Sequence, residues 1–401
     1  MCASKVIRIN PTEALLKRRL RKHLSLLGFS RGKNGSLSIP DNSKSAIRVL
    51  HAPQRAEILQ AQTSFIERKL PKLEHFFASG KEVNPEKIQV RIERVDSHTW
   101  QGDLFRLASL TWAVPVSSGF GRRLRFLVWD EQNGKLVGIL AIGDPVFNLS
   151  VRDQFIGWSG DDRRSRLVNI MDAYVLGALP PYNKLLCGKM VACLVRSVEV
   201  YKHFQKQYGS TTGIISGESK NARLLAVTTS SSMGRSSIYN RLKLDGVDYM
   251  KSIGFSGGWG HFHVPEELFE DLRNYLRLNG HEYADFHSFG QGPNWRIRVI
   301  RAALASLGFR GDMLKHGIQR EVFISLLAEN SCKILQEGRG QPKTRNLLTV
   351  KEIAEAASDR WVMPRAARVP EYKDWSSSAI SGLIKANYGL HSADLEKRSV
   401  K

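Results

Sequence analysis

Two apolar runs separated by an Asn-Gly pair constrain the fold of this chain more than any other feature. Leu124–Trp129 and Leu136–Ile142 are rich in residues that favour strands, and Asn133 and Gly134 lie between them. Both turn residues tolerate the positive φ angles of a tight turn, so we expect the two runs to form an antiparallel hairpin. A sheet that contains this hairpin should be the centre of the protein.

Further strands and helices are expected after the hairpin. The patterns predict strands over 167–179, 212–216, 224–228 and 261–264, and helices over 184–208 and 244–253. The order of hairpin, strand, helix, strand, strand, helix and strand predicts an α+β fold with a mixed, mainly antiparallel sheet.

Basic helices are expected on both sides of this core. Pro11–Leu27 and Arg296–Leu307 have apolar residues at helical spacing, and both end in Leu-Gly-Phe. Nothing beyond this stretch repeats, so we interpret them as two amphipathic helices that end alike. Helices are also expected over 55–77, 319–336 and 349–357. The chain should therefore contain a basic helical region at 1–90, an α+β core at 91–290 and a second basic helical region at 291–401.

The charge of the chain predicts its partner. Lys and Arg number 60 against 38 Asp and Glu, which gives a formal net charge of +22. Such a surplus attracts polyanions, and DNA, double- or single-stranded, is the expected one. A ribosome-associated protein, a membrane-surface protein or a basic protein with no polyanion partner are the alternatives. The residues expected to contact nucleic acid on the basic helices are Lys17, Arg18, Arg21, Lys22, Arg296, Arg298 and Arg301, although such residues can also form a solvated helix face.

The remaining composition indicates a cytoplasmic protein. No apolar run is long enough to span a membrane, and residues 1–10 have no apolar segment of the kind found in secretory signals. The four cysteines form no Cys-x-x-Cys pair, so reduced thiols are expected and a zinc ribbon is not. His261 and His263 alternate along a predicted strand, but no third ligand follows at a suitable spacing. No metal site is therefore predicted.

The segment Arg152–Ser159 contains a charged pair, an aromatic residue and a glycine. Arg152 is expected to hold a phosphate, with Asp153 fixing its guanidinium, and Trp158 to stack on an unpaired base. The alternative is a core tryptophan beside a surface ion pair.

Two further stretches suggest chemistry. Asp172 lies in an otherwise apolar predicted strand, where an unpaired carboxylate is costly, so it is a candidate general base. The alternative for Asp172 is a half-exposed strand position. A hydroxyl-rich stretch then contains Tyr239 as a candidate proton carrier, with Asn240 and Arg241 as candidate contacts to nucleic acid. A flexible serine loop is the alternative there. Asp172, Tyr239 and Asp153 form the predicted catalytic set.

Several segments resemble the DruA family of the Druantia anti-phage systems. The stretch at 143–159, GDPVFNLSVRDQFIGWS, is similar to the family's signature. The resemblance continues through 161–183, through GRSSIYNRL at 234–242 and through WVMPRAAR at 361–368, and covers about residues 10–375. It implies a role in phage defence, or in a mobile element that carries relatives. It implies no established catalytic residue.

A second resemblance concerns residues 100–264, whose hairpin, strand and long helix are similar to the centre of the GNAT acyltransferases. Residues 249–255 resemble the late helix of that fold. Leu185 stands where those enzymes carry a Gln or Arg for the coenzyme A pyrophosphate, and Met250 stands at their general-acid tyrosine. The cofactor is therefore unknown, and acetyl-CoA is not predicted.

Three functions remain open at this point. The first is a DNA-binding defence protein that acts on a base or a single strand through a GNAT-like core, as a DNA-modifying transferase. The second is a non-catalytic DNA-binding adaptor that recruits a helicase or other defence subunits. The third is a mobile-element nickase, for which the sequence shows no carboxylate cluster. Whether the chain is an enzyme is left open.

Overall fold

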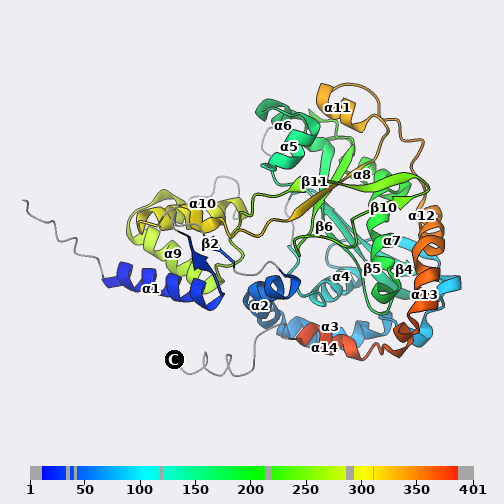
Figure 1. Ribbon diagram of the computed structural model, residues 1–401, viewed down its shortest axis with the longest axis horizontal. Coiled ribbons are helices and arrows are strands. Elements are labelled where there is room, and N and C mark those ends of the chain that lie inside the picture. Colours follow the sequence, from blue (N-terminus) through cyan, green and yellow to red (C-terminus); the bar gives the residue numbers. More distant parts are fainter. Residues whose placement is uncertain are drawn as a thin grey trace, which may run out of the picture. The chain divides into compact units, whose positions relative to one another are not determined.

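A computed structural model describes residues 11–32, 37–39, 43–117, 121–212, 219–285, 293–309 and 311–386 (Figure 1). These residues form two compact units. The helical unit consists of the described parts of 1–57 and 257–319, and the sheet unit of those of 58–256 and 320–386. Each unit combines segments that are distant in sequence, whereas the division at residues 90 and 290 follows the linear order and stays a prediction.

One sheet organises the sheet unit, with strand order β10-β11-β12-β9-β6-β5-β4-β3. All neighbours are antiparallel except β6 and β9, so the predicted α+β class with a mainly antiparallel sheet is confirmed. The strand bounds are β3 (Val90–Arg94), β4 (Arg123–Asp130), β5 (Lys135–Gly143), β6 (Ile170–Ala178), β9 (Ala226–Ser230), β10 (Leu242–Leu244), β11 (Val247–Phe255) and β12 (Glu321–Leu326). Shorter pairs are β1 (Ser30–Arg31) with β2 (Leu37–Ser38), and β7 (Thr211–Thr212) with β8 (Ser219–Lys220).

The predicted hairpin is confirmed as β4 and β5. Asp130 pairs with Lys135, and the Gly134 amide donates to the Asp130 carbonyl at 2.8 Å. Gly134 has a φ of +68°, which is why glycine suits this turn. The Tyr182 hydroxyl donates to the buried Asp130 carboxylate at 2.9 Å and accepts from the Asn133 amide at 2.9 Å. The turn is thereby anchored to the core.

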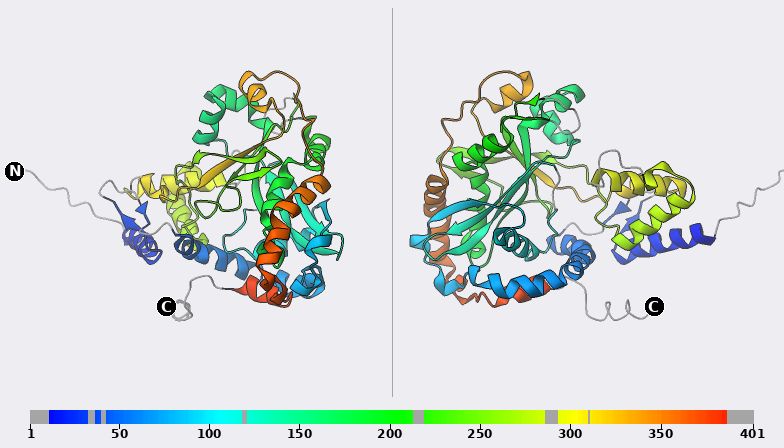
Figure 2. Two further views of the ribbon diagram at one scale, coloured as in Figure 1. Left: turned by 45° about the vertical axis from the view of Figure 1, so that its right-hand side comes forward. Right: turned by 180° about the vertical axis from the view of Figure 1, so that it is seen from behind.

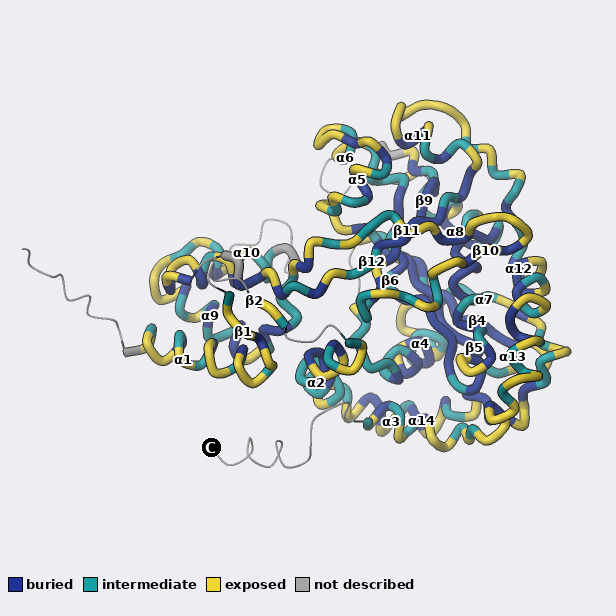
Figure 3. Tube along the Cα trace, viewed as in Figure 1, coloured by how far each residue is buried: buried dark blue, intermediate teal, exposed yellow. Residues whose placement is uncertain are grey.

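Helices cover both faces of the sheet (Figure 2). On one face α7 (Cys187–Cys193), α8 (Val198–Tyr208) and α12 (Val350–Ala357) contribute to the largest apolar cluster. On the other face α3 (Thr63–Leu73), α4 (Trp100–Leu110) and α14 (Ala379–Lys385) form a second cluster. A third cluster involves α5 (Ser150–Ile156) and α11 (Ser331–Glu337), beside α6 (Gly160–Arg166). The central strands β4, β5, β6, β9 and β12 are mostly buried, whereas β3 and β11 are partly exposed (Figure 3).

Three expected elements are wrong. The helix predicted over 244–253 is strand β11, because Asp245 and Gly246 have positive φ angles and turn the chain from β10 into a hairpin. The helix predicted over 319–336 is β12 followed by α11. The strand predicted over 261–264 is a turn. Of the strand predicted over 212–216, residues 213–216 lie outside the described residues.

Other helices agree with the sequence. The helix expected over 349–357 is α12, in which Thr349 and Glu352 form the expected capping box. The stretch at 184–208 divides into α7 and α8, since Ser197 caps a new helix. The stretch at 55–77 divides between α2 (Lys44–Ala61) and α3. Among the helices the structure describes, none combines the length and apolar character needed to cross a membrane.

In the helical unit α1 (Pro11–Leu26), α9 (Glu266–Leu278) and α10 (Pro293–Ser306) share one kind of ending. Gly28, Gly280 and Gly308 follow them with φ angles of +81°, +66° and +73°. The amide after the glycine bonds back into each helix, as from Phe29 to Leu24 at 3.1 Å and from Phe309 to Leu304 at 2.7 Å. The expectation that the two basic helices end alike is confirmed.

Candidate functional site

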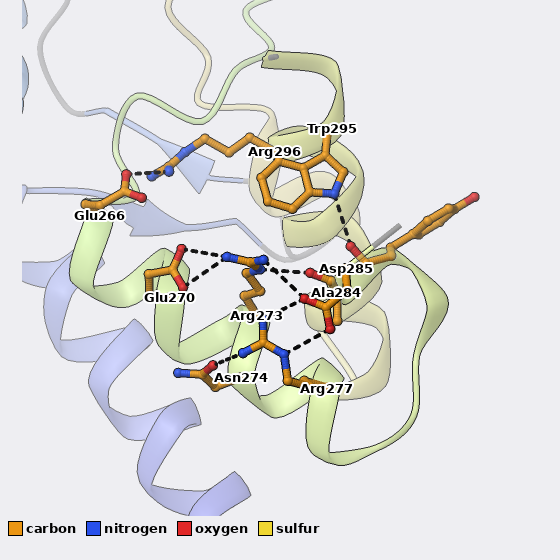
Figure 4. A network of polar contacts seen from close by, with 10 residues as sticks. Glu266, Glu270, Arg273, Asn274, Arg277, Ala284, Asp285, Trp295 and Arg296 are labelled. Atoms are coloured by element: carbon orange, nitrogen blue, oxygen red, sulfur yellow. Dashed lines mark hydrogen bonds and ion pairs between the residues drawn. The ribbon is translucent and has the colours of Figure 1, made fainter. Parts of the chain in front are cut away.

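Three acidic side chains of helix α9, Glu266, Glu267 and Asp271, bind arginines of the neighbouring helices α1 and α10. The fourth, Glu270, binds Arg273 of α9 itself, and Figure 4 shows the pairs of Glu266 and Glu270. Arg19 of α1 forms ion pairs with Glu267, at 2.6 Å, and with Asp271. Arg296 of α10 binds Glu266 at 2.6 Å, donates to the Val264 carbonyl at 2.9 Å and lies 4.0 Å from the centre of the Phe269 ring. The acidic residues of α9 therefore hold α1 and α10 by one arginine each, and Arg296 serves the fold.

Ion pairs also connect the C-terminal end of α9 to the turn that follows it. Arg277 donates to Asp285 at 2.7 Å and Arg273 to the same carboxylate at 3.2 Å, which lowers the pKa of Asp285 to about 2. Trp295 donates from its ring nitrogen to the Tyr283 carbonyl at 3.1 Å. These contacts connect the turn after α9 to α10 (Figure 4).

The other basic residues predicted to contact nucleic acid differ in their exposure. Lys17 is paired with Glu13 on its own helix. Within the described part of the chain no carboxylate pairs with the exposed side chains of Arg18, Arg21, Lys22, Arg298 and Arg301. Arg21 lies 5.4 Å from the centre of the Phe309 ring, so this part of α1 adjoins the end of α10. We call these five side chains the basic set.

Arg152 lies inside the sheet unit rather than on its surface. Its side chain is 0% exposed and donates to Asp153 at 2.7 and 2.9 Å and to the carbonyls of Val146 and Phe147 at 2.8 and 2.9 Å. Asp153 also accepts from Arg163 at 2.7 Å. The predicted contacts of Arg152 with phosphate and the catalytic role of Asp153 stay predictions, and this closed network gives them no support.

Trp158 is similarly committed to the core. Its ring nitrogen donates to the Leu335 carbonyl at 2.7 Å, and the ring packs in the cluster that includes α5 and α11. Gly157 ends α5 with a φ of +82°, and Ser159 caps α6. In this conformation the Arg152–Ser159 segment connects α5 to α6 and packs into the core. Base stacking by Trp158 stays a prediction.

Asp172 has an unusual environment on β6. It is partly exposed and accepts from the Thr228 hydroxyl at 2.8 Å. Removal from bulk water raises the pKa of Asp172 to about 6, while the Thr228 hydrogen bond and the charge of Arg152 oppose this shift. A carboxyl group poised near neutral pH suits proton transfer or ligand binding.

Tyr239 packs into the largest apolar cluster, beside Phe323 at a ring distance of 5.5 Å. Burial, together with the charge of Asp172, raises the pKa of Tyr239 to about 12 despite a hydrogen bond with Thr229. Met171 and Ala173 belong to the same cluster, so Asp172 between them points to the opposite face of the sheet. Asp172 and Tyr239 therefore point to opposite faces of the sheet, and their joint catalytic role with Asp153 stays a prediction.

Asn240 and Arg241 are exposed on the turn after Tyr239, and Arg241 has a φ of +55°. Their contact with nucleic acid stays a prediction. Nearby, Leu185 is fully buried and Ile238 packs beside Gly188, so these side chains offer no hydrogen-bond donor to a coenzyme A pyrophosphate. The residues do not fit acetyl-CoA at the place where the GNAT resemblance would put it.

His261 and His263 lie in a turn and do not form part of a metal-binding cluster among the described residues. His263 is buried, and burial lowers its pKa to about 3 and that of His261 to about 4. In the residues that the structure describes, no group of three or more His, Cys, Asp or Glu side chains could hold a metal ion.

Sequence reasoning missed the neighbours of Asp172. Thr228 lies on the adjoining strand β9, Tyr174 on β6 itself, and Arg125 on β4 beyond β5. The sequence patterns predict the individual strands but not which strands pair. The alternation of Arg123 and Arg125 with apolar residues at the start of β4 is the signal that indicates two arginines on one sheet face.

These features define a class: an α+β protein with a mainly antiparallel eight-stranded sheet and a helical unit that exposes the basic set on α1 and α10. A family model described as Druantia protein DruA matches residues 41–337. The chain is 62% identical over 379 residues to "Druantia protein DruA" of Escherichia coli (strain UMEA 4076-1), covering 94% of each chain. The chain belongs to the DruA family, and the resemblance read from its sequence is confirmed. No solved structure matches it.

Proposed function

We propose that this chain is a DNA-binding component of a Druantia anti-phage system, and that the helical unit makes the contact. Family membership supports the Druantia assignment. The contact with DNA is supported by the net charge of +22 and by the position of the basic set on α1 and α10.

The observation that carries the proposal is the sorting of charges around α9. The acidic residues of α9 neutralise Arg19 and Arg296, while Arg18, Lys22 and Arg298 stay exposed. Paired arginines hold the helices together, whereas exposed ones with no acidic partner repel each other and gain when phosphates approach. A surface meant only for solubility would not need its positive charges separated from the available acids.

The proposal is limited to binding. A catalytic role of Asp172, Tyr239 and Asp153 is not part of this proposal, since Asp172 and Tyr239 point to opposite faces of the sheet and Asp153 is bonded to Arg152 and Arg163. Recruitment of a helicase or other defence subunits by the bound protein is compatible with this function and would make the chain an adaptor.

The test measures the affinity of the full chain for double- and single-stranded DNA over a series of salt concentrations. Changing Arg18, Lys22 and Arg298 together to glutamine should weaken binding more than tenfold at moderate salt. The slope of log K against log salt should decrease by about 0.9 for each phosphate that the variant no longer neutralises.

A matched variant removes three exposed lysines of the sheet unit, Lys81, Lys202 and Lys351, and so has the same net charge. It should bind nearly as the unchanged protein does. Equal loss in both variants would show that only net charge matters, and an unchanged affinity in the first variant would refute the proposed interface.

A further inference from the structure

The apolar packing on one face of the sheet is interrupted. Ala141 and Val175 belong to the cluster with α3 and α4, whereas Ile170 and Ile324 belong to the cluster with α5 and α11. Between them the face carries polar side chains on neighbouring strands. Burying polar groups in a sheet face is costly, so this gap is not explained by stability.

A β-bulge brings Tyr174 to this face. Ile142 pairs with Ala173 and Ala141 with Val175, which leaves Tyr174 as the extra residue. Its ring lies over Gly143, where a Cβ atom would come within 3.1 Å of Tyr174 Cε1. The Tyr174 hydroxyl is buried and has no hydrogen-bond partner among the described residues. Bulges often redirect a side chain beside a functional site.

Positive charge lies on β4, which is separated from β6 by β5. Arg123 of β4 pairs with Gly143 of β5, which in turn pairs with Asp172 of β6, and Arg125 lies two residues further along β4. Arg125 donates to the Ser97 hydroxyl at 3.3 Å and lies 5.9 Å from the centre of the Phe105 ring. It pairs with no carboxylate within the described part of the chain. Its guanidinium is therefore available to an anion.

Asp172 places a carboxylate, a hydrogen-bond acceptor, on the same face of the sheet as these arginines. It is partly exposed, and among the described residues Thr228 is the donor to one of its oxygens while the other oxygen has none. The strands β4 and β6 are two interstrand spacings apart, about 10 Å. Arg125 is aligned through Ala141 with Val175, three residues from Asp172 along β6, so the two residues are also offset along the strands. A ligand with an anionic end and a hydrogen-bond-donating end would span this distance.

We propose that Arg125, Tyr174 and Asp172 form a binding site for a nucleoside phosphate on the sheet unit. Arg125 binds the phosphate, with Arg123 adding positive charge, and the Tyr174 hydroxyl donates to a phosphate or sugar oxygen. Asp172 accepts from the N–H groups of the base edge. The ligand is a free nucleotide or a nucleotide at the end of a single strand, since both present this chemistry.

The site does not depend on the proposed interface of the helical unit. A mononucleotide is small, so its binding reports on the sheet unit separately. The experiment measures binding of the four deoxynucleoside 5′-monophosphates and of a short single-stranded oligonucleotide to the full chain by calorimetry. Inorganic phosphate is the competitor, and the thermal midpoint of each variant shows that it is folded.

Arg125→Met should weaken binding about tenfold or more, and Tyr174→Phe about threefold to tenfold, because the first removes a charge-assisted hydrogen bond and the second a neutral one. Asp172→Asn should weaken it to a similar extent, while Arg125→Lys should restore part of the affinity. Arg164→Met, which removes an exposed arginine of α6, should leave binding unchanged, as should the Arg18, Lys22 and Arg298 variant with mononucleotides.

Preference for the mononucleotide or for the oligonucleotide identifies the source of the ligand. If neither probe binds, or if binding is the same in Arg125→Met and Asp172→Asn as in the unchanged chain, the site is refuted. Competition by inorganic phosphate as strong as that by the nucleotide would remove the role of the base and overturn the proposal.

Discussion

Arginine residues in this protein differ in function according to the depth at which they lie. Arg152 is enclosed and bonded to a carboxylate and two carbonyls, Arg296 is held by an acidic helix, and Arg298 is exposed. The sequence predicted all three as contacts to nucleic acid because it shows residue type and spacing only. Partner and burial depend on the fold, and they separate the three.

The buried network around Arg152 should be important for stability. Arg152→Met leaves part of the Asp153 carboxylate and two carbonyls without their donor, so we expect a loss of about 3–5 kcal/mol in the free energy of unfolding. The exposed Arg164 offers a control of the same chemistry, and Arg164→Met should change the free energy by about 0.5 kcal/mol or less. Denaturant unfolding followed by circular dichroism measures both, and equal losses would contradict the structural role of Arg152.

Gly308, the glycine after α10, should be required because of its positive φ angle and not because a side chain would clash. A Cβ atom at Gly308 would meet nothing within 4 Å, yet φ is +73°. Gly308→Ala should therefore destabilise the helical unit by about 1 kcal/mol through conformation only. Gly160, which also has open space but starts α6, is the control, and Gly160→Ala should not destabilise the protein. Thermal unfolding distinguishes the two, and equal shifts would contradict the explanation.

At the scale of elements, the sequence predicted best where local chemistry decides the structure. Asn133-Gly134 determines a turn, and Thr349 with Glu352 determines a helix start, so both were predicted correctly. Strand β11 was missed because its apolar residues Tyr249 and Met250 also fit a helical pattern, and only pairing with β10 and β12 decides between the two. Long-range pairing also places Arg125, Tyr174 and Asp172 on one face, which spacing alone could not show.

The turn that contains His263 should make the helical unit sensitive to acid. His263 is buried, its carbonyl contacts a ring nitrogen of His23 at 2.7 Å, and burial lowers its pKa to about 3. The unfolded chain gains a proton at this residue below about pH 6.5 while the folded chain does not, so stability decreases as the pH falls from 6.5 towards 3. At pH 5 the loss from this residue is about 2 kcal/mol.

Replacing His263 by glutamine removes one titrating group and should reduce the slope of this part of the stability profile, while His261 keeps its own contribution. Unfolding measured between pH 5 and pH 7 for both proteins checks the expectation. A profile with the same slope in the variant would assign the acid sensitivity to other groups.

At the scale of the whole molecule, the two proposed binding surfaces lie on different units. The helical unit exposes the basic set, and the sheet unit carries the gap between its apolar clusters. Net charge predicted a polyanion partner from the sequence but could not say which residues are available for it. The composition counts paired and exposed arginines alike.

Binding of DNA by the whole chain should depend steeply on salt. If the five side chains of the basic set each contact a phosphate, affinity should fall a few hundredfold between about 50 and 200 mM salt. Fluorescence anisotropy with labelled DNA measures this slope. A nearly constant affinity over that range would contradict an electrostatic interface.

The segment between β11 and β12 has a consequence for synthesis of the protein. Phe255 and Glu321 are cross-strand partners, and β12 lies between β11 and β9 in the sheet. A ribosome therefore completes β9 and β11 and then much of the helical unit before the strand that joins them emerges. Until then both strands have an unpaired edge, the kind of edge that invites association with other chains. Newly made copies are most vulnerable to aggregation during that interval.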